Sequence, residues 1–130
     1  MKKLTLILAL VTVTALATFG QSVKKCDGTM VTFAKDKVGR LNKDDIRDFL
    51  LTFGKECENN VEFGEYSNEV LFLVLDKQTE LTLQTIEKQK HQLELNEILS
   101  ALSSPINDGI DVKSLIPRVD QVKFDRRLKK

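Results

Sequence analysis

Residues 34–45, which read AKDKVGRLNKDD, have the outline of a calcium-binding loop, with Gly39 near the centre and an acid, Asp45, at the last position. Such a loop supplies oxygen ligands from its first, third, fifth and last positions. Here the first and fifth positions are Ala34 and Val38, which have no side-chain oxygen, and four basic residues crowd the same stretch. We therefore predict that the segment binds no metal and that Gly39 turns the chain.

No other group of residues indicates catalysis. The chain has one histidine, His91, which stands in a polar run beside two lysines and is expected at the surface. Without a second histidine, a typical zinc site is poorly supplied. The sequence contains no G-x-S-x-G, H-E-x-x-H, Walker or G-x-G-x-x-G motif. We predict no catalytic residue, no metal and no cofactor, and the alternative is a small hydrolase that uses carboxylates.

An acidic stretch is the strongest candidate for a binding surface. Residues 56–69 read ECENNVEFGEYSNE and contain five glutamates but neither lysine nor arginine. One interpretation is a surface for a cationic partner, with two aromatic contact residues. Its members would be Glu58, Glu62, Phe63, Glu65 and Tyr66. The other interpretation is a solvated loop whose two aromatic side chains fill the core.

The C-terminal end has the opposite charge. The last nine residues, VKFDRRLKK, carry five cations and one acid. A solvated helix end would have this composition, because cations are favourable near a helix C-terminus. The alternative is contact with an anionic lipid or an acidic partner.

The N-terminus predicts export. Lys2 and Lys3 precede the uncharged apolar residues 4–14, and small residues follow. This order is typical of a secretory signal peptide, so we expect residues 1–20 to be removed; the alternative is an uncleaved anchor. The short apolar run and the lack of an Asn-x-Ser/Thr acceptor favour a bacterial protein of the periplasm or one that is secreted.

Removal of the signal leaves 18 basic and 19 acidic residues, a balance that argues against nucleic acid as a partner. Residues 21–130 suffice for a single domain. The two cysteines of an exported domain, Cys26 and Cys57, are expected to form a disulfide rather than reactive thiols, because no C-x-x-C pair is present.

The elements that would position these residues are predicted to be mainly α-helical, in a small array of about five helices. Asn42 can cap a helix that Gly54 ends, and this helix has one apolar face made of Ile46, Phe49, Leu50 and Phe53. A further helix carries a stripe of Leu95, Ile98, Leu99 and Leu102, and serines 103 and 104 end it.

Two segments are ambiguous. Residues 70–75 are all apolar and suit a buried strand or a helix buried on all sides. We predict a helix capped by Ser67 or Asn68, with a break near residues 77–79. In residues 23–33, Asp27 and Gly28 predict the turn of a short β-hairpin, with an irregular N-terminal arm as the alternative.

Together these observations predict an exported helical domain without catalytic activity that binds another protein of the cell envelope. We expect no nucleic acid as a partner and no stable membrane insertion after signal removal. Besides the hydrolase, a periplasmic stress chaperone is a further alternative.

Overall fold

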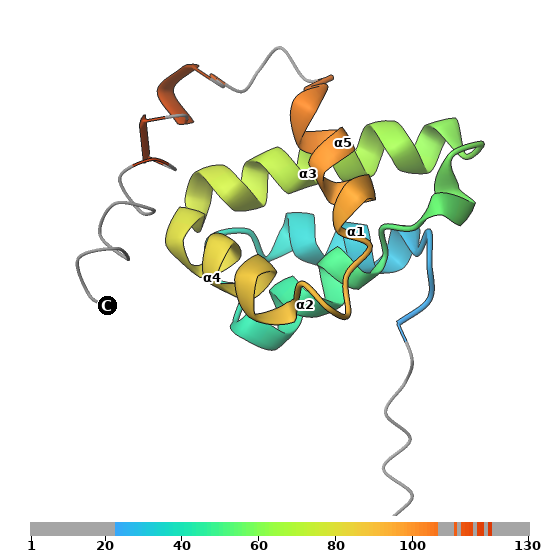
Figure 1. The fold of residues 1–130 in the computed structure, drawn as a ribbon, viewed down its shortest axis with the longest axis horizontal. Coiled ribbons are helices and arrows are strands. Elements are labelled where there is room, and N and C mark those ends of the chain that lie inside the picture. The colour runs from blue at the N-terminus through green and yellow to red at the C-terminus, as the bar shows by residue number, and fades with distance from the viewer. Residues whose placement is uncertain (1–22, 107–110, 112, 116, 119, 121–130) are drawn as a thin grey trace, which may run out of the picture.

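The computed structural model describes residues 23–106, 111, 113–115, 117, 118 and 120. This part of the chain forms five α-helices and one 3-10 helix (Figure 1), which confirms the predicted mainly helical fold. The elements are α1 (Gly28–Asp36), α2 (Lys43–Leu51), η1 (Lys55–Cys57), α3 (Val61–Lys77), α4 (Thr79–Gln89) and α5 (Leu95–Ser103). The predicted signal peptide, residues 1–20, and the basic residues 123–130 lie outside the described residues.

The longest helix, α3, is the centre of the arrangement. It packs against α1, α4 and α5, while α2 packs against α1 and α4. In Figure 1, α3 crosses the upper part of the molecule, with α1, α2 and α4 below it. None of the helices in the described part of the chain is long and apolar enough to cross a membrane.

The predicted apolar face of α2 is buried. Ile46, Phe49 and Leu50 are fully buried, and the ring of Phe53 lies 5.5 Å from that of Phe49 in an edge-to-face contact. These side chains belong to the same core cluster as Val70 and others from α3. Residues 70–75 are helical, as predicted, and only Leu73 among them is partly exposed. The whole segment is apolar because α3 is enclosed there on nearly every side.

The predicted β-hairpin is not present, and residues 28–36 form α1 instead. The side chain of Asp27 accepts hydrogen bonds from the backbone N–H groups of Thr29, at 2.9 Å, and Met30, at 3.4 Å, and so caps the helix. An aspartate suits a tight turn and a helix N-terminus for the same reason, because its carboxylate accepts from nearby backbone N–H groups. Burial of Val31 and Ala34 in the core favours the helix α1 over the predicted hairpin.

The start predicted for the third helix was also wrong. α3 begins at Val61, where the side chain of Asn60 accepts from the N–H of Phe63 at 3.0 Å. Ser67 and Asn68, predicted as caps, are buried within the helix. Most of the acidic stretch is therefore helix rather than loop. The predicted break is confirmed, since Gln78 separates α3 from α4.

Gly54 does not end α2 in the predicted way. The helix ends at Leu51, and the backbone of Gly54 is extended, with φ of −164°. A Cβ atom there would lie 2.4 Å from a carboxylate oxygen of Glu56 and 2.9 Å from the side chain of Lys25, so these two flexible side chains would have to move.

Residues 34–45, the segment that resembles a calcium loop, form the end of α1, a turn and the start of α2. Ala34 belongs to α1, and Gly39 has a positive φ of 85°, which glycine adopts without strain. Asn42 and Asp45 form the two reciprocal hydrogen bonds of a capping box at the start of α2, at 2.9 and 3.0 Å. The predicted cap of α2 is therefore confirmed.

Gln78 fixes the turn that precedes α2. Its carboxamide oxygen accepts from the N–H groups of Gly39 and Leu41 at 3.1 and 3.0 Å, and its nitrogen donates to the carbonyl of Leu41 at 2.7 Å. We expect Gln78→Ala to cost about 1–3 kcal/mol, because it removes three hydrogen bonds to backbone groups. Urea denaturation would measure this loss. Gln84→Ala, which removes one exposed bond to Glu80, is the control and should cost less than about 0.5 kcal/mol; equal losses would contradict the role of Gln78.

Candidate functional site

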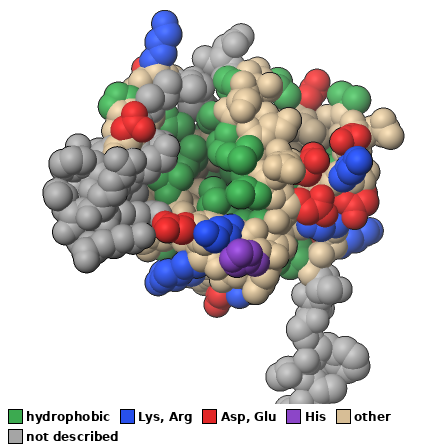
Figure 2. Space-filling model, in the orientation of Figure 1, with side chains coloured by type: hydrophobic (Ala, Val, Ile, Leu, Met, Phe, Trp, Pro, Cys, Tyr) green, Lys and Arg blue, Asp and Glu red, His purple; other side chains and the backbone are tan. Residues whose placement is uncertain are grey.

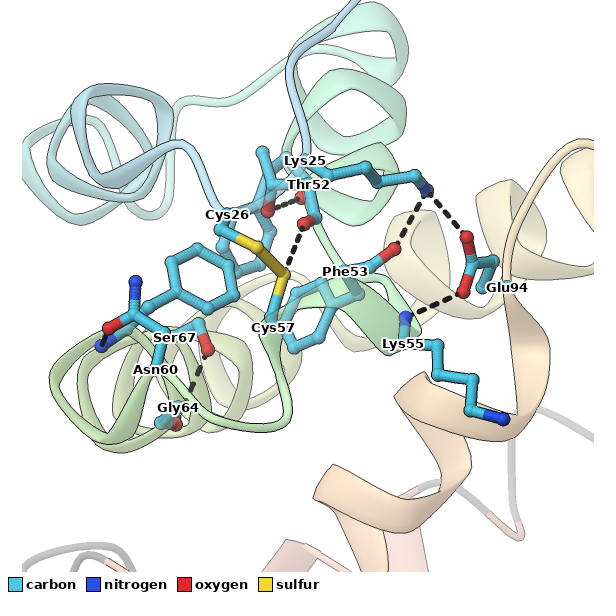
Figure 3. The surroundings of a disulfide bond; sticks show 12 residues. Lys25, Cys26, Thr52, Phe53, Lys55, Cys57, Asn60, Gly64, Ser67 and Glu94 are labelled. Carbon is cyan, nitrogen blue, oxygen red and sulfur yellow. Dashed lines mark hydrogen bonds and ion pairs between the residues drawn. A yellow bond between two sulfur atoms is a disulfide. The ribbon is translucent and has the colours of Figure 1, made fainter.

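The N-terminal arm is fixed to the loop between α2 and α3 (Figure 3). Cys26 and Cys57 form the predicted disulfide, with their Cα atoms 5.6 Å apart, and the N–H of Cys26 donates to the carbonyl of Thr52 at 2.8 Å. Lys25 donates to the carbonyl of Phe53 at 2.8 Å. These contacts hold the loop in a fixed place beside the start of α3.

Glu94 attaches the start of α5 to the same loop. One carboxylate oxygen accepts from the backbone N–H of Lys55 at 2.8 Å, and the other lies 3.5 Å from Nζ of Lys25 (Figure 3). The far end of α5 is held by Asn68, which donates to the carbonyls of Ala101 and Ser104 at 2.9 and 3.1 Å. Asn68 is only 3% exposed, so its amide is a buried link between α3 and α5.

Between these attachments lies an open groove, which we call the α3–α5 groove. Its volume is about 440 Å³, within the range of small-ligand sites. Phe53, Phe63 and Ala101 supply its apolar surface, and Val61 and Ile106 stand at its edge. In Figure 2, hydrophobic side chains lie across the middle of this face, and acidic side chains, with some basic ones among them, lie on the side where η1 and the start of α3 are found.

The charged residues of the α3–α5 groove are all acidic. Glu58, Glu65 and Glu97 line it, and no lysine or arginine of the described residues does. A neighbouring hollow on α3 is lined by Glu62, Glu65 and Glu69, with no basic residue from positions 23–106. Of these acids only Glu69 has an ionic partner within the described part of the chain, Lys35 at 3.2 Å. The groove therefore combines apolar contact area with three carboxylates, Glu58, Glu65 and Glu97, that form no ion pair within the described part of the chain.

The structure brings the residues of the predicted partner surface to this region but gives them different roles. Glu58, Glu62 and Glu65 are exposed. Phe63 is only 7% exposed and packs 6.2 Å from the ring of Phe53, so it forms the groove floor and does not project. Tyr66 is half-buried, and Nζ of Lys35 lies 5.1 Å from the centre of its ring.

The apolar stripe predicted for α5 is only partly buried, since Ile98 is fully buried but Leu99 is 49% exposed. Two further apolar side chains that reach solvent were missed by the sequence analysis. Val61 is 69% exposed and Ile106 is 55% exposed. Val61 directly follows Asn60, the residue that caps α3. If the start of α3 had been predicted at Val61, the side chain of Val61 would have been expected on the solvent side of the first turn. Ile106 carried no such signal, because its position depends on the bond from its N–H to the side chain of Asn68, at 3.1 Å.

Within the described residues, no group of three or more histidine, cysteine, aspartate or glutamate side chains is placed to hold a metal ion. His91, in the turn after α4, is exposed. The candidate site is thus a surface for contact, defined by shape and charge.

Comparison with known proteins provides no relative from which a function could be transferred. The chain matches no protein-family model, no curated protein and no solved structure at a significant level.

Proposed function

We propose that this protein is an exported binding module without catalytic activity, and that its α3–α5 groove holds a cationic, amphipathic segment of another protein of the cell envelope. One observation carries the proposal: the groove has an apolar floor, and among the residues that the structure describes, Glu58, Glu65 and Glu97 are its only charged lining residues. Apolar side chains of the partner would displace water from Phe53 and Phe63, and its lysines or arginines would meet the carboxylates. Charge complementarity of this kind favours the correct partner and speeds association.

The exposure of the acids to water favours a binding module over a hydrolase that uses carboxylates. Glu58 and Glu65 are exposed to water, whereas catalytic carboxylates usually work in pairs whose surroundings separate their pKa values. A stress chaperone would bury its apolar surface until stress exposes it, but Val61 and Ile106 are already exposed in the folded chain.

A peptide titration tests this function. The probe is a short synthetic peptide of leucine and lysine with helical spacing, labelled for fluorescence anisotropy, and its leucine–glutamate counterpart is the negative probe. We expect only the lysine peptide to bind, and to bind less well as salt is raised, because exposed charge pairs are screened. The variant Glu58→Gln/Glu65→Gln should weaken binding about fivefold to tenfold, since each exposed charge pair contributes up to about 1 kcal/mol.

The matched control is Asp36→Asn/Asp44→Asn, which removes two exposed acids from α1 and α2, away from the groove. It changes the net charge equally, so it should reproduce only the long-range part of the effect. Equal weakening by the two double variants would show that net charge, not the groove, attracts the peptide. Equal binding of both probes would contradict the cationic class of partner.

A further inference from the structure

Four acids share one face of α3. Glu62, Glu65, Glu69 and Asp76 follow one another at spacings of three, four and seven residues, which place side chains on the same side of a helix. We call this face the acidic stripe. Glu69 is paired with Lys35, and Asp76 is paired with Arg118 at 2.6 Å. Glu62 and Glu65, at the end nearest the α3–α5 groove, have no ionic partner in the described part of the chain.

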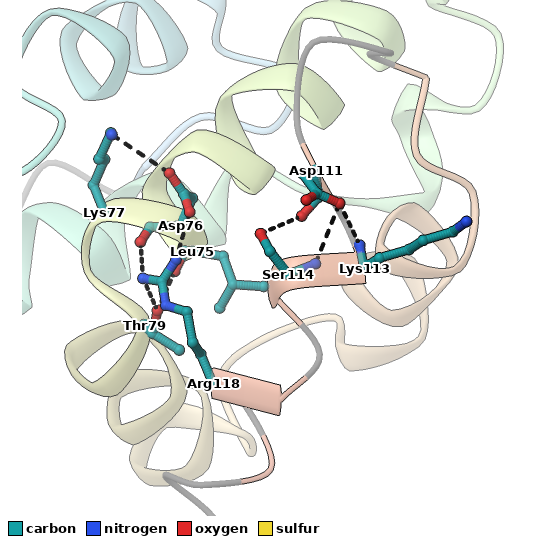
Figure 4. A network of polar contacts seen from close by, with 8 residues as sticks. All are labelled: Leu75, Asp76, Lys77, Thr79, Asp111, Lys113, Ser114 and Arg118. Carbon is teal, nitrogen blue, oxygen red and sulfur yellow. Dashed lines mark hydrogen bonds and ion pairs between the residues drawn. The ribbon is translucent and has the colours of Figure 1, made fainter.

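The C-terminal part of the chain is attached at the other end of the acidic stripe. Leu115 is only 3% exposed and packs with Phe72 and Leu75 of α3. Arg118 donates to the carboxylate and carbonyl of Asp76, and also to Oγ1 of Thr79 at 2.9 Å (Figure 4). One guanidinium of this segment therefore already occupies the last acid of the stripe.

The residues that follow have the charge that the rest of the stripe lacks. Residues 121–130 contain five cations, one acid and the apolar side chains of Val122, Phe124 and Leu128. This is the cationic, amphipathic composition that the proposed function requires of a partner. These cations therefore belong to the same chain as the acidic groove that would bind them.

The distances allow this contact within one molecule. Glu62 and Asp76 are fourteen residues apart on α3, or about 21 Å at 1.5 Å per residue. From Arg118 to Arg126 an extended chain reaches about 26 Å, at about 3.3 Å per residue. Arg126 and the cations after it can therefore reach Glu62 and Glu65 while Arg118 stays on Asp76.

We propose that residues 121–130 dock along the acidic stripe and onto the α3–α5 groove of the same molecule, and that an external partner must displace them. The inference rests on the proposed function, because it assigns the groove an internal competitor of the same chemical class as the partner. A short tether gives such a segment an effective concentration in the millimolar range, so weak contacts suffice for high occupancy. When the tail occupies the groove nine-tenths of the time, the apparent Kd of a partner rises about tenfold.

The test uses the full chain with a tail that has lost its cations and keeps the charge of Asp125, because five residues become glutamine: Lys123, Arg126, Arg127, Lys129 and Lys130. We expect this variant to bind the leucine–lysine peptide about tenfold more tightly than the unmodified protein. The control replaces five other cations with glutamine, all exposed and outside the groove: Lys24, Arg40, Lys43, Lys88 and Lys90. Because the net charge changes equally, the control should strengthen binding far less.

A second measurement does not depend on an external partner. In NMR spectra, removing the five tail cations should shift the amide signals of Glu62, Glu65 and Glu69 in the free protein, whereas the control substitutions should not. Unchanged signals, or equal peptide affinity of the tail variant and the unmodified protein, would overturn the inference while leaving the proposed function intact. Shifted signals without any binding of the peptide would support the docked tail and reject the external partner. Signals that depend on protein concentration would overturn docking within one molecule.

Discussion

Replacement of Phe49 by alanine is expected to lower the free energy of unfolding by about 3–5 kcal/mol, a large part of the roughly 5–15 kcal/mol available to a domain. The ring is fully buried on α2, and it contacts the ring of Phe53, which in turn contacts that of Phe63 on α3. Alanine would leave a cavity at the point where α2 meets the groove floor. Urea denaturation followed by circular dichroism would measure the loss.

Asp48→Ala is the neighbouring control. The Asp48 carboxylate accepts two hydrogen bonds from Arg47, which raise the pKa of that guanidinium, but the pair is partly exposed. Loss of such a pair should cost no more than about 1 kcal/mol. If Phe49→Ala left the unfolding midpoint unchanged but abolished binding of the cationic peptide, the face of α2 would be a contact surface and its placement in the core would be wrong.

Removal of the disulfide is expected to have an effect of similar size. Cys26 and Cys57 are 31 residues apart, and closing a loop of this length restricts the unfolded chain by roughly 3–4 kcal/mol in the chain-entropy estimate. The double variant Cys26→Ser/Cys57→Ser should therefore unfold at a much lower urea concentration. Binding of the peptide should weaken too, because Cys57 lines the groove and the disulfide fixes the loop that forms one of its sides.

Two controls test whether the loss of stability comes from the missing cross-link. Reduction of the unmodified protein should destabilise it as much as the double variant does, since both remove the same cross-link. A thiol count on the unreduced, unfolded protein should give zero. Two free thiols in correctly exported material would instead assign Cys26 and Cys57 a reactive role.

Local signals were enough to predict part of the fold. Asn42 and Asp45 cap α2 across three residues. The helix α5 was predicted from its apolar residues, but only Ile98 of that stripe is buried and Leu99 faces solvent. The break at Gln78 also follows from neighbours in the chain. Residues 70–75 suit either a strand or a helix, and packing of α3 in the core accompanies the helix. With only two cysteines, a single intramolecular pairing exists. These features depend on backbone capping and helical periodicity, which short stretches of sequence record directly.

The sequence was ambiguous where one residue suits two local structures. Asp27 favours both a hairpin turn and a helix cap, and burial of Val31 and Ala34 against other helices decides for α1. Asn60 was passed over as a cap because the acidic residues after it resemble a loop. Their helical state depends on packing of the α3 face that carries Phe63.

Only the tertiary structure assembles the candidate site. The α3–α5 groove takes its floor from Phe53 and Phe63 and its edge from Ile106, residues from distant parts of the chain. The acidic composition of residues 56–69 could be read from the sequence alone. That Phe63 faces inward while Glu65 faces outward depends on where α3 begins, and that Arg118 meets Asp76 depends on the return of the chain across α3. Contacts between residues far apart are set by the burial of whole helices, for which no short segment holds the information.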